Sequence, residues 1–386
     1  MYKVEWVNSV ADISTSLWDE CFAAPYEGRW WYEALESAGL QDQFEFKYGL
    51  VSKGGRPVAI APAFVMNVPI ELVIPPALLP IFKALGKLFP AMLYQRTFFI
   101  GSPCSDEGRV GVAQGADVTA ILGAVNQSMF EQADQSGATM RVWKDFATEH
   151  QSAFVDLMHA QGLFHLVSFP GTSLPLEGNK KEDYIASIKS SRRNKLKKKL
   201  KQAHEAPVYV ETLQNPGVAV MDEIFALFWQ TYEKGSTKFE RLNRKFFDVL
   251  SKDEHSHYVI LRRNDTNEMV AFMLCFALGE HVINKFIGID YRQPKEWFLY
   301  FKLWDAAVEW SYSVGGKSIQ SGQTGYAPKI ELGNDMVPLN NYCRHKNPVV
   351  NFIYRLVAST INWDTLDQDL AIYVKAYPEL KPGVFK

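Results

Sequence analysis

The feature that most constrains the fold of this chain is a series of short apolar segments, separated by turns, in its second half. Two strands joined by the polar sequence NDTNE predict a hairpin, a third strand follows a Gly-Glu turn, and a helix and a last strand complete the series. The segments are PVYVETL (207–213), MDEIFALFWQTYEK (221–234), HYVILRR (257–263), MVAFMLCFAL (269–278), HVINKFIGID (281–290), WFLYFKLWDAAVEWSYSV (297–314) and KSIQSG (317–322). The order β-α-α-β-β-β-α-β predicts an α+β fold, in which helices flank a mixed, mostly antiparallel sheet.

The first half of the chain repeats part of this order. FKYGLVSKGGRPVAIAPAF (46–64) resembles HYVILRRNDTNEMVAFMLCF (257–276), because each has an early tyrosine, a polar turn and then an apolar strand with a Val-Ala pair. A predicted helix at 117–137 then leads to a strand at 138–146, as the helix and last strand of the second half do. The repeat predicts a duplication.

The length of 386 residues exceeds that of most single domains, so we expect two domains, 1–169 and 170–386. The boundary falls in PGTSLPLEGN (170–179), which is rich in Pro, Gly and Ser. The N-terminus lacks a basic segment followed by an apolar run, and the four cysteines are scattered without a CxxC pair. These features predict a cytoplasmic protein without a cysteine metal site, and the scattered histidines predict no metal either.

Residues 70–94 form the most apolar stretch, which four prolines and two lysines interrupt. No run of the length that spans a bilayer remains. We expect an insertion in the N-terminal domain that packs over a cleft. The alternative is an interfacial segment that contacts an acyl chain or the cytoplasmic face of a membrane.

The most basic stretch is KSSRRNKLKKKLK (189–201), in which eight of thirteen residues are cationic and none is acidic, although the net charge of the chain is only −2. It lies in a predicted helix, 179–206, that Pro207 ends. Paired hydroxyls and guanidiniums suit phosphate oxygens, and an anion would relieve the repulsion among the cations. We therefore expect Arg192, Arg193 and Lys195 to face an anionic donor or acceptor. A wholly solvated helix is the alternative.

The element order, the basic helix and the segment SGQTGYAPKIELG (321–333) together resemble the GNAT acyltransferase superfamily. They are most similar to its FemAB-like, peptidoglycan-biosynthesis-type branch, in which two GNAT-like domains are fused. In that branch an acidic or amide residue, a glycine and a lysine follow the last strand, and Gln323, Gly325 and Lys329 match them here. The resemblance implies an N-terminal domain that is non-catalytic, and a substrate- or anion-binding role for Gln323 and Lys329.

One segment departs from the GNAT pattern. The coenzyme A loop of GNAT enzymes, Q/R-x-x-G-x-G/A, corresponds to RQPKEWF (292–298), which has no glycine. The amides at the start of the following helix would still offer donors and a positive dipole end to a pyrophosphate. Arg292 and Lys295 would add positive charge, whereas Glu296 opposes binding and Pro294 removes one donor.

Acyl transfer to an amine requires a base for the amine proton, stabilisation of the oxyanion and a proton for the leaving group. By analogy with GNAT enzymes, the backbone at Gly288 and Ile289 would approach the donor, although Gly288 is equally interpreted as a packing glycine. Asp290 and Glu296 are the candidate bases, and Tyr326 is the candidate acid for a leaving thiolate. A capping, dipole-pairing or core role is the alternative for each.

The resemblance thus implies an N-acyltransferase that moves an acyl group from acetyl-CoA or a longer acyl-CoA to an amine of a small molecule or cell-envelope precursor, without a metal. A Fem-like transferase that uses aminoacyl-tRNA is the first alternative, because the glycine loop is missing. The near-neutral net charge favours acyl-CoA over RNA. A non-catalytic GNAT-fold binding protein is the second alternative.

Overall fold

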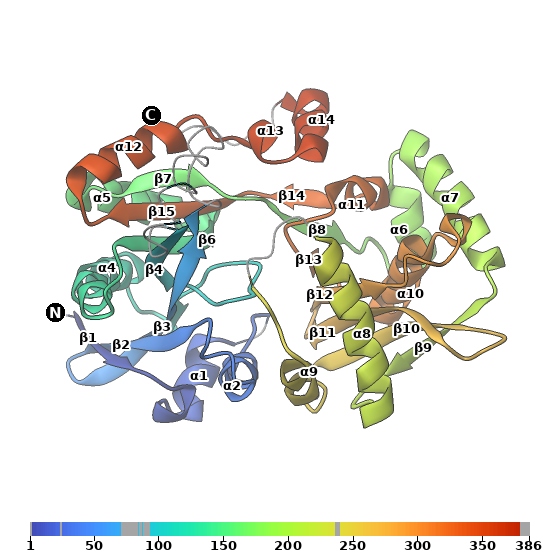
Figure 1. Ribbon diagram of the computed structural model, residues 1–386, viewed down its shortest axis with the longest axis horizontal. Coiled ribbons are helices and arrows are strands. Elements are labelled where there is room, and N and C mark those ends of the chain that lie inside the picture. The colour runs from blue at the N-terminus through green and yellow to red at the C-terminus, as the bar shows by residue number, and fades with distance from the viewer. Residues whose placement is uncertain are drawn as a thin grey trace. The chain divides into compact units, whose positions relative to one another are not determined.

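The computed structural model describes residues 2–23, 25–70, 84, 87, 93–235 and 240–378. They form two compact units. Unit 1 comprises Met1–Ala23, Leu40–Pro170 and Pro338–Lys386, and unit 2 comprises Ala24–Gly39 and Gly171–Val337. Neither unit is a continuous stretch of chain, because an early segment joins unit 2 and the C-terminal segment joins unit 1. Each unit contains one mixed, mostly antiparallel sheet flanked by helices, which confirms the predicted α+β class (Figure 1).

The sheet of unit 2 has the strand order β14-β8-β13-β12-β11-β10-β9. Every neighbouring pair is antiparallel except β12 and β13, which are parallel. The strands are β8 (Gly171–Pro175), β9 (Val208–Leu213), β10 (Ser256–Arg263), β11 (Met269–Leu278), β12 (His281–Ile289), β13 (Ser318–Ser321) and β14 (Asp335–Val337). The helices are α2 (Arg29–Ser37), α6 (Lys181–Ser187), α7 (Ser190–Glu205), α8 (Val218–Lys234), α9 (Arg244–Leu250), η6 (Lys295–Trp297), α10 (Leu299–Ser313) and α11 (Tyr326–Leu332).

Helices cover both faces of this sheet. On one face, Leu196 of α7 and Trp304 of α10 pack into the same core as Met273 of β11. On the other, Phe228 of α8 contacts Phe286 of β12 with ring centroids 5.9 Å apart. Because strand side chains alternate between faces, a strand covered on both sides must be apolar throughout. This explains the unbroken apolar sequence of β11.

The sheet of unit 1 has the order β1-β2-β3-β4-β6-β15-β7, with β5 beside β3. Its strands are β1 (Tyr2–Val7), β2 (Glu45–Lys53), β3 (Arg56–Pro69), β4 (Tyr94–Ile100), β5 (Gly111–Val112), β6 (Met140–Ala147), β7 (Phe164–Val167) and β15 (Leu339–His345). Its helices are η1 (Val10–Asp12), α1 (Thr15–Cys21), α4 (Val118–Gln135), η5 (Thr148–His150), α5 (Gln151–Gln161), α12 (Pro348–Ala358), α13 (Trp363–Leu366) and α14 (Gln368–Ala376).

The two units share one order of elements. In unit 1, the antiparallel strands β2, β3 and β4 are followed by α4 and by β6, which runs parallel to β4. In unit 2, β10, β11 and β12 are followed by α10 and by β13, which runs parallel to β12. The similar sequences 46–64 and 257–276 therefore occupy equivalent hairpins, as the repeat predicts.

The prediction of one continuous helix over 179–206 was wrong. The segment forms α6 and α7, separated at Ile188, whose backbone is extended (φ −62°, ψ 136°). The break lets Tyr184 and Ile188, as well as Leu196 and Leu200 further on, enter one core. An unbroken helix would not turn all four side chains inward, because the number of residues between the two apolar pairs places the pairs on different sides of a continuous helix.

The stretch 70–94, apart from a few positions, lies outside the described residues, so its expected insertion and membrane contact stay predictions. Within the part of the chain that the structure describes, no helix is both long enough and apolar enough to cross a bilayer.

Candidate functional site

The central strands β12 and β13 of unit 2 pair along only part of β12 and then diverge. Their parallel ladder ends at the pair Asn284–Ser321, and β12 continues to Ile289 without a described strand on that side. The amide of Asp290 donates to Val270 of β11 at 2.8 Å, whereas the amide of Ile289 points the other way and donates to the Thr231 hydroxyl at 3.3 Å. By alternation, the amide of Ile287 also points to the open edge. The divergence thus presents backbone donors where a ligand can approach.

A β-bulge lies at the point of divergence. Leu274 pairs with Phe286 and Cys275 with Asn284, so Lys285 is the extra residue of β12. Its ammonium contacts Glu27 at 2.9 Å and lies 4.9 Å from the centre of the Trp31 ring. The Lys285 side chain is only 1% exposed and that of Glu27 only 15%. Sequence reasoning missed this pair, although a lone lysine in the apolar strand HVINKFIGI was the available signal.

Gly288 has a packing role in this structure. A Cβ atom added to it would lie 2.4 Å from the Phe272 ring and 2.7 Å from the backbone carbon of Leu227 in α8. Such distances leave no room for any side chain, so glycine lets α8 cross close to β12. Of the two interpretations of Gly288, close helix packing is therefore the one with direct contacts.

The loop after β12 is held by the Asp290 carboxylate. Oδ1 accepts from the backbone amide and Nε of Arg292 at 3.0 and 2.8 Å, and Oδ2 accepts from Gln293 at 2.8 Å. Burial alone would raise the pKa of Asp290, but the hydrogen bonds from Arg292 and Gln293 outweigh burial and hold the pKa below its usual range. Asp290 is thus an ionised anchor of the loop at neutral pH, and Arg292 is engaged by it.

The remainder of this loop carries backbone strain. Phe298, the residue before α10, adopts a left-handed conformation (φ 45°) that non-glycine residues rarely occupy. Lys295 and Glu296 precede it and are both exposed. The start of α10 therefore offers its amides without the glycines that usually let a pyrophosphate approach closely.

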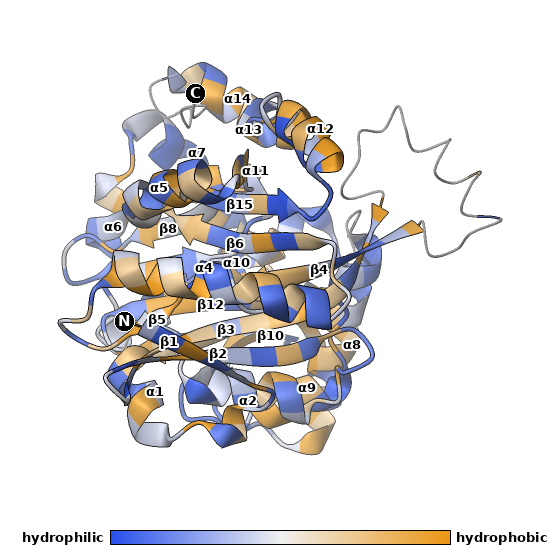
Figure 2. Cartoon of the chain, turned by 90° about the vertical axis from the view of Figure 1, so that its left-hand side faces the viewer, coloured by the Kyte–Doolittle hydropathy of each residue, from blue (hydrophilic) through white to orange (hydrophobic). Residues whose placement is uncertain are grey.

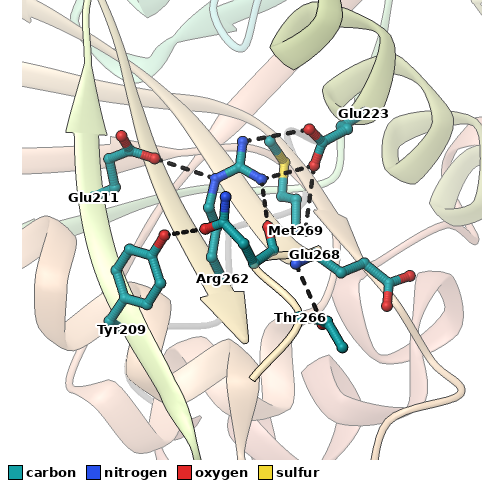
Figure 3. A network of polar contacts seen from close by, with 8 residues as sticks. Tyr209, Glu211, Glu223, Arg262, Thr266, Glu268 and Met269 are labelled. Atoms are coloured by element: carbon teal, nitrogen blue, oxygen red, sulfur yellow. Dashed lines mark hydrogen bonds and ion pairs between the residues drawn. The ribbon is translucent and has the colours of Figure 1, made fainter. Parts of the chain in front are cut away.

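Two neighbouring arginines at the end of β10 contact the elements around the loop that follows β12. Arg262 is buried and contacts Glu211 of β9 at 3.2 Å and Glu223 of α8 at 2.8 Å, as Figure 3 shows. Arg263 donates to Gln293 at 3.3 Å, and its guanidinium lies 5.5 Å from the centre of the Trp297 ring. The end of β10 thus joins α8 to the loop after β12. No sequence pattern marked these arginines.

The turn between β13 and α11 begins where β13 diverges from β12. Tyr326 is 1% exposed, and its hydroxyl donates to the Gln323 carbonyl at 2.6 Å. Lys329 is 6% exposed and donates to the Gly322 carbonyl. Gly325 adopts the left-handed conformation (φ 67°) that the turn requires. The structure thus brings Gln323, Tyr326 and Lys329 together, through contacts that fix the turn.

The arginines of α7 mainly contact backbone carbonyls. Arg193 donates to the carbonyls of Ala186 and Ile188 at 2.6 and 3.2 Å, at the end of α6. Arg192 donates to the Ile330 carbonyl of α11 at 3.4 Å, whereas Lys195 is exposed. These arginines thereby satisfy the last carbonyls of two helices.

A groove of about 470 Å³ runs between α6, α7 and α10. It is lined by cationic, acidic and apolar side chains, namely Lys181, Ile185, Lys197, Leu200, Lys201, His204, Glu205 and Asp305. Lys181 is already paired with Asp305 at 3.0 Å and Glu309 at 2.9 Å. Lys197 and Lys201 are exposed cations that border this groove.

In unit 1, a loop that contains Gly108 occupies the edge next to the equivalent strands β4 and β6. The parallel ladder of β4 and β6 ends at Ile100–Trp143, and Gly108 then bridges Phe146 and donates to the Asp145 carbonyl at 2.9 Å. A Cβ on Gly108 would lie 1.8 Å from the Lys144 carbonyl oxygen, so only glycine fits. The loop therefore occupies the edge that corresponds to the one where β12, among the described residues, has no neighbouring strand in unit 2.

The fold, with a parallel pair of central strands after a helix in each unit, is that of tandem GNAT-like proteins. The chain belongs to the FemAB-like family, described as peptidoglycan biosynthesis/recognition, whose model matches residues 9–346. This confirms the resemblance drawn from the sequence. Among the described residues, no group of three or more His, Cys, Asp or Glu side chains is placed to hold a metal ion.

Solved structures of the same fold include FemX, 11% identical, with 91% of this chain and 100% of that chain covered and a TM-score of 0.60. The structure of L-PGS from Bacillus licheniformis is 12% identical, with 84% and 92% covered and a TM-score of 0.52. A tandem GNAT protein from the clavulanic acid biosynthesis pathway is 11% identical, with 90% and 99% covered and a TM-score of 0.51. A search of curated proteins finds no significant match.

Proposed function

We propose that this protein transfers an acyl or aminoacyl group from an activated ester or thioester to an amine of a peptidoglycan-type precursor. The observation that carries the proposal is the divergence of β12 from β13, with the amides of Ile287 and Ile289 on the open edge. Preorganised amides at such an edge stabilise the oxyanion of acyl transfer. Because Thr231 engages Ile289, the amide of Ile287 is the better candidate. The family membership supports the acceptor class.

Unit 2 is the proposed catalytic unit, and unit 1 the non-catalytic one. The support is the contrast between the two edges: Gly108 and its loop fill the edge beside β6, whereas β12 has no described strand beyond Asn284 on the side that faces β13. In this scheme the Lys285–Glu27 pair fixes the bulge that turns β12 away from β13. Glu296, which is exposed in η6 just before α10, remains the candidate base. Tyr326 remains the candidate proton donor to the leaving group.

Of the two donors, aminoacyl-tRNA is favoured by the loop at 290–298. It lacks the glycines of a pyrophosphate cradle, and Arg292 is engaged by Asp290. Lys197 and Lys201 at the α7 groove would contact RNA phosphates. Acyl-CoA is kept as the second donor because a helix N-terminus such as that of α10 supplies backbone amides and a positive dipole end for a pyrophosphate.

The test is turnover of the full chain with acetyl-CoA, palmitoyl-CoA or charged tRNA, and a peptidoglycan precursor as acceptor, followed by mass spectrometry. We expect a mass increase of one aminoacyl group with charged tRNA. The logarithm of the tRNA binding constant should fall linearly with the logarithm of the salt concentration. The double variant Lys197→Gln with Lys201→Gln should reduce the slope of this line by about 1.4–1.8, because two phosphate contacts are lost. Turnover with acyl-CoA alone would assign the second donor. Turnover with none of the three would contradict a transferase function.

A further inference from the structure

Helix α12 (Pro348–Ala358) turns its most apolar face away from unit 1. Val349, Phe352, Ile353 and Leu356 are 66%, 59%, 48% and 53% exposed. At 3.6 residues per turn these four side chains fall within an arc of about 100°. Figure 2 shows hydrophobic colouring along part of α12. A surface helix of a globular protein normally turns such a stripe toward its core, so this helix has the reverse orientation.

Specific contacts on its opposite side fix this orientation. The Asn351 side chain accepts from the His345 amide at 2.8 Å and donates to the Gly162 carbonyl at 3.2 Å. The Tyr354 ring packs edge-on against His345, with centroids 5.8 Å apart, and Ala358 is buried. The helix is therefore anchored through polar and small residues, and rotation of the apolar stripe toward the core would break these bonds.

The charged residues in the sequence of α12 and the residues just before it have one sign. Between Arg344 and Ser359 the sequence contains three cations, Arg344, Lys346 and Arg355, and no acidic residue. Lys346 is 58% exposed, although Asp134 of α4 pairs with it at 3.1 Å. Acidic residues resume only at Asp364, in α13. An apolar stripe bordered by cations is the pattern of helices that lie in the surface of an anionic bilayer.

An exposed aromatic residue lies close to the same helix. Tyr94 begins β4 and is 54% exposed, and the next residue, Gln95, lies near Tyr354 of α12. Tyrosine is enriched where proteins meet the headgroup region of membranes. One helical face of three turns is also too small for a stable protein interface, which takes about 800 Å² from each partner.

We propose that α12 is a membrane-surface helix that inserts Val349, Phe352, Ile353 and Leu356 into an anionic lipid bilayer. The helix lies beyond the region 9–346 that the family model matches, and the proposal does not depend on the transfer chemistry. It would hold the protein at the surface where lipid-linked amines are found.

The test is flotation of the full chain with vesicles of phosphatidylglycerol and phosphatidylcholine in equal parts, and with phosphatidylcholine alone. Phe352→Gln and Leu356→Gln are the variants, and Val218→Gln, at a 74% exposed aliphatic position of α8, is the matched control. We expect binding to the anionic vesicles, a loss of roughly tenfold in affinity for each α12 variant, and no change for the control. Hydrogen exchange of the α12 amides should slow in the presence of the vesicles.

Equal vesicle binding by the wild type and both α12 variants would overturn the proposal, as would no binding by the wild type. Sedimentation velocity without lipid distinguishes the rival occupant. A dimer that Phe352→Gln dissociates, together with absent vesicle binding, would assign the face to a second copy of the chain. Because the substituted side chains are exposed, the variants should keep the unfolding temperature of the wild type, which excludes misfolding as the cause.

Discussion

Lys285 and Glu27 form an ion pair of 2.9 Å that links the bulge of β12 to a segment 258 residues earlier in the chain. Both side chains are largely removed from solvent, and the Trp31 ring lies against the ammonium. A buried pair adds little net stability, but loss of one partner leaves an uncompensated charge. The pair therefore makes the geometry of the candidate site depend on the early segment of unit 2.

Removal of one member of this pair should destabilise the protein strongly. We expect Glu27→Gln to lower the free energy of unfolding by about 3–5 kcal/mol in urea titrations, because the buried Lys285 ammonium loses its ion pair with the Glu27 carboxylate. The double variant Glu27→Leu with Lys285→Met should recover most of that loss. If the double variant is stable and fully active, the pair has no role in transfer, and its assignment to shaping the site is contradicted.

Substitution of Gly288 by alanine should test its role in close packing. Gly288→Ala forces a Cβ into the Phe272 ring and the backbone of Leu227, so we expect a loss of about 1–3 kcal/mol in the free energy of unfolding. Gly123→Ala in α4 is the control, because nothing lies within 4 Å of its added Cβ. It should be stabilising by about 0.5–1 kcal/mol. Similar effects of both substitutions would refute the close crossing of α8 and β12.

The proposed catalytic role of Tyr326 can be tested by measuring kcat and KM separately. Loss of the hydroxyl in Tyr326→Phe removes its bond to the Gln323 carbonyl and should cost about 1 kcal/mol of stability. If the hydroxyl also protonates the leaving group, kcat should fall roughly a hundredfold or more while KM stays unchanged. An unchanged kcat would leave Tyr326 with its role in the turn alone.

Arg193 and Lys198 should behave differently although both belong to the basic stretch. Arg193 donates to two carbonyls at the end of α6, so Arg193→Ala should lower the unfolding temperature, whereas the exposed Lys198→Ala should not. We also expect Arg193→Ala to weaken binding of the anionic donor or acceptor, as the sequence predicts. Donor and acceptor affinities equal to those of the wild type would limit Arg193 to joining α6 and α7.

His165 should contribute a pH dependence to stability. Burial lowers its pKa, and the hydrogen bond to Asn340 at 2.7 Å only partly opposes that effect. The unfolded chain therefore takes up a proton near pH 6.5, while the folded protein does so only at lower pH. As pH falls through this range, the free energy of unfolding should decrease. Urea midpoints at pH 7.5 and 5.5 (about one unit either side of the ordinary pKa) measure the decrease, and His165→Gln should reduce it; an equal decrease in the variant would contradict this role.

The local elements and their order could be predicted from the amino-acid sequence. The polar NDTNE turn, the apolar β11 and the Gly-Gly stop after α10 each act through neighbouring residues, so the hairpin, the third strand and the helix could be predicted. The α+β class and the family followed from that order. The Gln323–Lys329 turn could be located for the same reason, since its residues are close in the chain.

Contacts between residues far apart in the chain could not be predicted in this way and depend on the folded structure. Glu27 and Lys285 are brought together by the packing of α2 against Phe276 of β11 and Phe246 of α9, and no local pattern encodes that contact. The break between α6 and α7 arises because four apolar side chains enter one core, which overrides the helical preference of the basic stretch. The outward stripe of α12 likewise depends on Asn351 and Tyr354 finding partners in unit 1. Long-range packing fixes such arrangements, because side-chain contacts depend on distance in space and not on separation along the chain.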